Sequence, residues 1–220
     1  MSTPAAALAY LLEERMRPGA DTAAVDRRIR TMFAEKWCVV FTDMSGFSRK
    51  AAREGIIPFL ALIHQLDRIC RPIIRDQGGL FLKAIADSYM VLFRRPKDAM
   101  SACIAMEQAI ERYNGDRLEP DRIYMGCGIG YGECLKLGDD DVYGVEVNFA
   151  ARLGEDLSGP YEILATPAAV KAIGRMKGVS FKRVPGGRLG GTKLPYYRAA
   201  YPLGDPGEAG RARRARTTFR

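Results

Sequence analysis

The sequence predicts an α+β protein built on a ferredoxin-like β-α-β-β-α-β core with an antiparallel sheet. Two observations lead to this fold class. Short apolar runs alternate along the chain with segments in which apolar residues recur every three to four positions. In addition, the stretch LFLKAIADSYMVLF (80–93) reads as two strands around a tight turn near Ala86-Asp87. The order strand, helix, strand, strand, helix, strand is that of the split β-α-β unit, in which the helices cover one face of the sheet.

The core elements can be assigned in chain order. WCVVFTD (37–43) is an apolar run that ends in an acid, which is typical of a buried strand. Residues 97–113 form the second core helix, and DRIYMGCGIGYGECLKL (121–137) suggests a further pair of strands. The first core helix, residues 54–75, ends at Gly78-Gly79 and carries one apolar stripe made of Ile56, Phe59, Leu60, Ile63, Leu66, Cys70, Ile73 and Ile74.

Further elements extend this core at both ends. Residues 3–16 and 21–35 are both expected to be helices, the second with an N-cap at Asp21-Thr22, and together they form a helical hairpin that serves packing or dimer contact. The C-terminal extension consists of helices at 144–156 and 167–174 and of the strands YEILAT (161–166), VSFKRV (179–184) and YYRAAY (196–201).

The length of 220 residues fits one sizeable domain with appendages. We expect an N-terminal helical segment at 1–36, a catalytic domain at 37–203 and a disordered basic tail at 204–220. The formal net charge is +8, but the tail alone holds five Arg against one Asp and one Glu. Because the rest of the chain is only modestly basic, the charge does not indicate a nucleic-acid binder, although a role of the Arg-rich tail in such binding is an alternative.

Composition also argues against several other classes. No apolar run is long enough to cross a bilayer, so we expect no membrane association. The five cysteines form no CxxC pair and lie mostly in apolar stretches, which is typical of reduced thiols in a cytoplasmic protein. With a single histidine, His64, a zinc site is not expected.

Two acidic residues lie at the ends of predicted strands. Asp43 ends the first strand beside the small-residue turn Met44-Ser45-Gly46, and Asp87 lies in the turn of the strand pair. In the expected fold these turns are neighbours, and two close carboxylates repel unless a divalent cation neutralises them. Taken singly, Asp43 could instead cap a helix and Asp87 could be an ordinary turn residue.

Three further polar residues stand in apolar surroundings. Lys83 lies in a predicted strand, where a charge is costly unless it is exposed or paired. Asn148 and Arg152 are one helical turn apart and therefore share a helix face. Arg152 could form an exposed i,i+4 ion pair with Asp156, but the neighbouring VNFAARL is apolar, which suggests that the Asn-Arg pair faces a ligand.

The motifs FTDMSGF, KAIADSYMVLF, GIGYGE and DVYGVEVNFAARL, in this order and spacing, resemble the catalytic domain of class III nucleotidyl cyclases, over about residues 37–200. The resemblance implies a homodimer that converts ATP to 3′,5′-cyclic AMP and pyrophosphate with two divalent cations, Mg²⁺ or Mn²⁺, at sites shared across the dimer interface. A departure from the family pattern is Ala86, which stands where Gly is usual.

The resemblance also implies residue roles. Asp43, Asp87 and the Met44 carbonyl match the metal ligands, while Lys83 and Asp141 match the pair that reads the adenine edge. Asn148 matches the residue that orients the ribose, and Arg152 matches the one that stabilises charge on the α-phosphate. The loop over Met44, Ser45, Gly46, Phe47 and Ser48 matches the cradle of the β- and γ-phosphates, with Lys193 or Arg188 as a further phosphate contact.

Chemistry favours ATP over GTP. A lysine donates to adenine N1 and an aspartate accepts from the N6 amino group, whereas guanine would require an acceptor in place of Lys83. A cyclase for GTP or a pyrimidine nucleotide, and an inactive nucleotide sensor, remain the alternatives.

Overall fold

The computed structural model describes residues 3–45, 55–115, 117–185, 188–189, 192–193 and 195–203. The main sheet comprises β1 (Ala34–Met44), β2 (Leu80–Ile85), β3 (Ser88–Phe93), β4 (Met125–Leu137), β5 (Asp141–Tyr143), β6 (Ile163–Ala165), β7 (Ser180–Val184) and β10 (Tyr196–Ala200). Two short strands, β8 (Arg188–Leu189) and β9 (Thr192–Lys193), pair separately. The helices are α1 (Pro4–Met16), α2 (Thr22–Phe33), α4 (Ile56–Asp76), α5 (Pro96–Asn114), α6 (Val145–Ala151) and α7 (Pro167–Ile173), with a 3₁₀ turn at Glu119–Asp121 and a π-helix at Arg152–Leu157.

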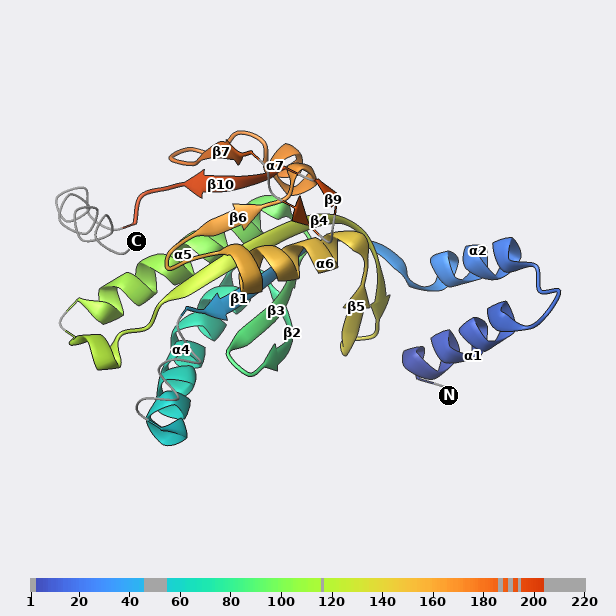
Figure 1. The fold of residues 1–220 in the computed structure, drawn as a ribbon, viewed down its shortest axis with the longest axis horizontal. Coiled ribbons are helices and arrows are strands. Elements are labelled where there is room, and N and C mark those ends of the chain that lie inside the picture. The colour runs from blue at the N-terminus through green and yellow to red at the C-terminus, as the bar shows by residue number, and fades with distance from the viewer. Residues whose placement is uncertain are drawn as a thin grey trace.

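The sheet has the strand order β2-β3-β1-β4-β6-β10-β7, and β5 pairs with β4 (Figure 1). Its first four strands are antiparallel neighbours, and α4 and α5 connect them in the order that a β-α-β-β-α-β core requires. The parallel pairing of β6 with β4 then begins the C-terminal extension. The α+β class and the ferredoxin-like core predicted from the sequence are therefore confirmed.

Strand β1 is buried on both faces, because helices lie on both sides of it. Cys38 and Val40 point into a cluster with α4 and α5, in which Ala99, Cys103, Met106 and Ile110 of α5 are fully buried. Val39 and Phe41 alternate with them and pack on the opposite face, in a cluster that includes residues of α6. We expected helices on one face only. The two core helices obey this, but α6 covers the other face (Figure 1).

The stretch predicted as two strands at 121–137 is a single strand, β4, that pairs with β1 along its whole length from Met44 with Met125 to Ala34 with Leu135. Its alternating glycines do not mark a turn. A Cβ on Gly128 would overlap the backbone of Ala150 and Gly154, and one on Gly130 would overlap that of Glu146. The glycines therefore allow α6 and the π-helix to lie directly on the strand.

The predicted N-terminal helical hairpin is present as α1 and α2, which project from the sheet (Figure 1). Asp21 caps α2 as expected, because its Oδ1 accepts from the Ala24 N–H at 2.9 Å. The inner face of the hairpin, with Leu11, Val25, Ile29 and Phe33, packs against Leu137 at the end of β4. The chain passes from α2 directly into β1, which begins at Ala34 and not at residue 37.

All five cysteines are buried and free, as their apolar surroundings predicted. In the part of the chain that the structure describes, no helix combines the length and the apolar character needed to span a bilayer. The predicted tail at 204–220 lies outside the described residues.

Candidate active site

Asp43 and Asp87 come together at one end of the sheet. Asp43 is the penultimate residue of β1, and Asp87 lies in the two-residue turn between β2 and β3, of which β3 is the neighbour of β1. Ser88, which follows Asp87, donates its hydroxyl to Asp43 Oδ1 at 3.1 Å. The sequence-based expectation that these two turns are neighbours is met.

The surroundings of the two carboxylates raise the pKa of both side chains. Burial, followed by the charge of Asp87, raises the pKa of Asp43 to about 6, and Glu155 and Asp156 add to this effect. Burial also raises the pKa of Asp87. Such a pair of carboxylates has an electrostatic cost that a bound cation would relieve.

The turn that presents Asp87 has an unusual backbone. Ala86, just before it, has φ +53°, in the left-handed region that disfavours residues with a Cβ. This is the position at which the sequence departs from the glycine of the resembling family. The turn forms in spite of the alanine, because β2 and β3 pair up to Ile85 and Ser88 on either side of it.

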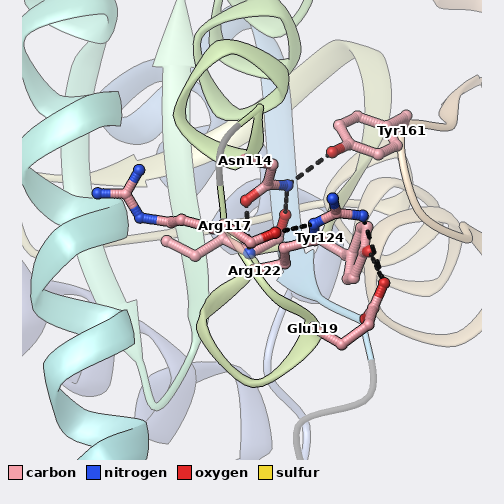
Figure 2. Close-up of polar contacts among 7 residues, drawn as sticks. Asn114, Arg117, Glu119, Arg122, Tyr124 and Tyr161 are labelled. Atoms are coloured by element: carbon pink, nitrogen blue, oxygen red, sulfur yellow. Dashed lines mark hydrogen bonds and ion pairs between the residues drawn. The ribbon is translucent and has the colours of Figure 1, made fainter.

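A buried polar network joins Asn114, at the end of α5, to Tyr161 and to Ile123, which precedes β4 (Figure 2). Asn114 Nδ2 donates to the Ile123 carbonyl at 2.6 Å and to the Tyr161 hydroxyl at 2.7 Å, while its Oδ1 accepts from the Ile123 N–H at 2.9 Å. The next residue, Tyr124, accepts the Ser45 N–H at 2.9 Å through its carbonyl. The network therefore fixes the position at which the predicted phosphate loop starts.

Ser45 is the last described residue of that loop. Met44 is buried and pairs with Met125. The predicted phosphate-binding residues Gly46, Phe47 and Ser48 lie outside the described residues. The other predicted phosphate contacts, Arg188 and Lys193, are backbone register partners in the pairing of β8 with β9.

Lys83 and Asp141 form an ion pair although they are 58 residues apart. Lys83 Nζ lies 2.9 Å from Asp141 Oδ2, and both side chains are about one-third exposed or less. Burial acts to raise the pKa of Asp141, but hydrogen bonds from Lys83 and the Val142 N–H outweigh it, so the pKa lies below its ordinary value. Tyr143 also donates its hydroxyl to Oδ2, at 3.3 Å. Asp141 is therefore the acidic residue of β5 that contacts Lys83.

Asn148 and Arg152 lie on the exposed side of α6 and of the π-helix that continues it. Arg152 Nη2 lies 3.4 Å from Asp156 Oδ2, so the i,i+4 ion pair considered from the sequence is present in the isolated chain. The pair is about half exposed, which makes it weak and easily exchanged for a phosphate. Asn148 and Arg152 thus remain available to a ligand.

Sequence reasoning missed Ser88 and Glu155 as neighbours of the two aspartates. Glu155 is exposed, but partial desolvation, together with the charges of Asp156 and Asp87, raises its pKa. Ser88 directly follows Asp87, so its position was a usable signal. Glu155 belongs to the π-helix, which the local sequence pattern did not predict, so its approach to the aspartates was not foreseen.

The fold is that of solved cyclase structures. A sequence model described as the adenylate and guanylate cyclase catalytic domain matches residues 30–192. The chain therefore belongs to the adenylate and guanylate cyclase catalytic domain family. This family binds nucleoside triphosphates, works as a dimer and generally uses divalent metal ions.

Similar solved structures include both kinds of cyclase. An adenylate/guanylate cyclase/hydrolase from Silicibacter pomeroyi is 22% identical, with a TM-score of 0.67 over 77% of this chain and 98% of that one. The adenylyl cyclase CyaB from P. aeruginosa is also 22% identical, with a TM-score of 0.63 over 77% and 94%. The guanylate cyclase domain of RhGC from Catenaria anguillulae, in complex with GTP, is 17% identical, with a TM-score of 0.64 over 76% and 98%.

A curated relative is the serine/threonine-protein kinase pkn2 of Myxococcus xanthus, 25% identical over 101 residues. The match covers 46% of this chain but only 12% of that protein. These likenesses support the fold and the family, and they do not choose between adenine and guanine.

The residues present fit a divalent cation. In the described ranges, no group of three or more His, Cys, Asp or Glu side chains is arranged to hold a metal. The donors are instead two carboxylates, Asp43 and Asp87, and burial, followed by the charge of Asp87, raises the pKa of Asp43. Mg²⁺ is commonly held by one or two carboxylates together with water and substrate phosphates, so this sparse donor set suits Mg²⁺ or Mn²⁺ bound with a nucleotide.

Proposed function

We propose that this chain is an adenylate cyclase that converts ATP to 3′,5′-cyclic AMP and pyrophosphate at a homodimer interface. The observation that carries the choice of ATP is the ion pair between Lys83 and Asp141, which presents a hydrogen-bond donor and an acceptor side by side. Adenine offers the complementary edge, with N1 as acceptor and the N6 amino group as donor.

In the proposed reaction the ribose 3′-oxygen attacks the α-phosphorus in line with the leaving group. A bond forms between this oxygen and phosphorus, the bond from phosphorus to the β-phosphate oxygen breaks, and the 3′-hydroxyl loses its proton. Two divalent cations, when bound, supply neutralisation of the phosphates and lower the pKa of that hydroxyl. Asp43 and Asp87, with the Met44 carbonyl, are the residues that would hold them.

The other residues act on the nucleotide itself. Arg152 meets the negative charge that develops at the α-phosphate, and Asn148 orients the ribose. The loop over residues 44–48, with Ser45, Gly46, Phe47 and Ser48, cradles the terminal phosphates, helped by Arg188 or Lys193. Lys83 and Asp141 hold the base, so the ribose is fixed between the bound base and the bound phosphates.

We place the metal ligands of one protomer opposite the base-binding and ribose-binding residues of its partner. Asn148 and Arg152 are exposed in the single chain, and exposed large apolar residues, Tyr143 and Val145, lie close to them in sequence. These features support a face that a second copy covers. Each homodimer would then have two equivalent sites.

The test is product identification with purified full-length protein. The protein is incubated separately with ATP, GTP, CTP and UTP in the presence of Mg²⁺ or Mn²⁺, and cyclic nucleotide and pyrophosphate are measured. We expect cyclic AMP as the main product. Preferential formation of cyclic GMP or of a cyclic pyrimidine nucleotide would overturn the choice of ATP, and nucleotide binding without pyrophosphate release would indicate an inactive sensor.

A further inference from the structure

Tyr143 stands out beside the base-reading pair, because its side chain is exposed while its hydroxyl is directed at a carboxylate. The residue is 52% exposed, and its hydroxyl lies 3.3 Å from Asp141 Oδ2. Residues 141 and 143 occupy the same face of the short strand β5, since side chains alternate along a strand. Val142, between them, is 2% exposed and anchors the strand in the cluster of α6 and β1.

The Asp141 carboxylate has three partners from within the chain. Oδ1 accepts from the Val142 N–H at 2.8 Å, and Oδ2 accepts both from Lys83 at 2.9 Å and from Tyr143. A base that binds to Lys83 shares that side chain with Oδ2, because the ammonium then also donates to the ring nitrogen. The bond from Tyr143 does not depend on the base and remains in place.

We propose that Tyr143 is a positioning residue for base recognition, whose hydroxyl keeps the Asp141 carboxylate oriented toward the exocyclic amino group when Lys83 also donates to the base. The inference rests on the proposed function, in which Lys83 and Asp141 read adenine. Tyr143 does not touch the reacting atoms, so it acts on binding and base preference rather than on the chemical step.

The first test compares Tyr143→Phe with the wild-type enzyme in KM and kcat for ATP and GTP. Loss of one hydrogen bond to a charged group is expected to raise the KM for ATP about 3- to 10-fold and to lower the preference for ATP over GTP, with kcat within about 2-fold. Tyr10→Phe is the matched control, because Tyr10 on α1 is similarly exposed, at 56%. Tyr143→Leu should behave like Tyr143→Phe if the hydroxyl is responsible.

Values of KM and base preference for Tyr143→Phe equal to those of Tyr10→Phe would overturn the inference. So would a fall in kcat with an unchanged KM, which would indicate a role in the chemical step.

A second readout separates this inference from the proposed function. The Asp141 carboxyl is titrated by ¹³C NMR in wild type and in Tyr143→Phe without nucleotide, with Asp141→Asn used to assign the signal. Removal of the hydroxyl should raise the pKa of Asp141, because a bond to the ionised form is lost while Lys83 remains. An unchanged pKa overturns the positioning role even if the wild-type protein cyclises ATP. A raised pKa supports the contact even if the nucleotide assay fails.

Discussion

The Ser88 hydroxyl donates to Asp43 Oδ1 at 3.1 Å and so links the end of β1 to the turn that carries Asp87. This single bond joins two parts of the chain that are 45 residues apart. It offsets part of the effect of burial and of the Asp87 charge, which raise the pKa of Asp43, since it favours the ionised form. Because the pKa of Asp43 stays above its ordinary value, the free energy of unfolding should depend on pH and on any cation that binds Asp43.

The pKa of Asp43 gives the direction of that dependence. Its value in the folded protein, about 6, lies above the ordinary value of 3.8, so between these values the folded state binds more protons than the unfolded chain. The free energy of unfolding of the cation-free protein should therefore fall as the pH rises from about 4 to about 6. Mg²⁺ or Mn²⁺ competes with the proton, so it should raise the Tm above pH 6 and have little effect at pH 5.

Differential scanning fluorimetry at pH 5 and pH 8, with and without the cation, measures both effects. Asp43→Asn is the matched variant, and it should lose the cation-dependent rise in Tm. An equal cation-dependent rise in Tm at both pH values would contradict the assignment of Asp43 as a ligand. So would a rise in Tm in Asp43→Asn as large as that in the wild type.

Ala86→Gly should stabilise the protein. Ala86 has φ +53°, where a Cβ costs about 1 kcal/mol, and part of this gain is lost to the greater freedom of glycine in the unfolded chain. We expect a gain of up to about 1 kcal/mol in the free energy of unfolding, measured by urea denaturation. Ala84→Gly is the control, because Ala84 is also exposed but lies within β2, and it should destabilise the protein instead. A loss of stability in Ala86→Gly would show that the turn does not strain this residue.

Gly128→Ala should disrupt the contact between β4 and α6. The added Cβ would overlap the backbone of Ala150 and Gly154, which cannot move as a flexible side chain can. We expect a loss of about 3 kcal/mol or more in stability, together with loss of activity, because Asn148 and Arg152 lie on the displaced helix. Gly115→Ala is the control, since a Cβ there would meet only the Arg112 carbonyl, at 3.4 Å. Comparable stability of the two variants, measured by thermal denaturation, would rule out this close approach.

Mixing two inactive variants tests whether the site is shared between protomers. Asp43→Ala and Arg152→Ala should each be inactive, because each lacks one half of both sites. Random exchange of protomers gives a heterodimer in half of the molecules, with one intact site of two, so the mixture should regain about a quarter of wild-type activity. Each variant mixed with fresh protein of its own kind serves as the control. Absence of recovery, with protomer exchange verified by differently tagged chains, would exclude the shared-site arrangement.

The order of the elements was accessible from the sequence because local patterns fix it. Apolar periodicity located α4 and α5. Asp21 marked the start of α2, because its side chain caps the N–H of Ala24, only three residues further along the chain. The same patterns failed at β4, where glycines at alternate positions resembled turn signals. Only packing distinguishes a glycine that turns the chain from one that admits a helix against it.

The candidate site likewise has a part that local sequence motifs predict and a part that only the tertiary structure sets. The residue types and spacings of Asp43, Asp87, Lys83, Asn148 and Arg152 could be recognised in the sequence, because each belongs to a contiguous motif. Pairing of Lys83 with Asp141 and the approach of Glu155 to the aspartates were decided by tertiary structure. These contacts depend on how β5 and the π-helix lie against the sheet, and that geometry arises from burial of distant segments rather than from any local pattern.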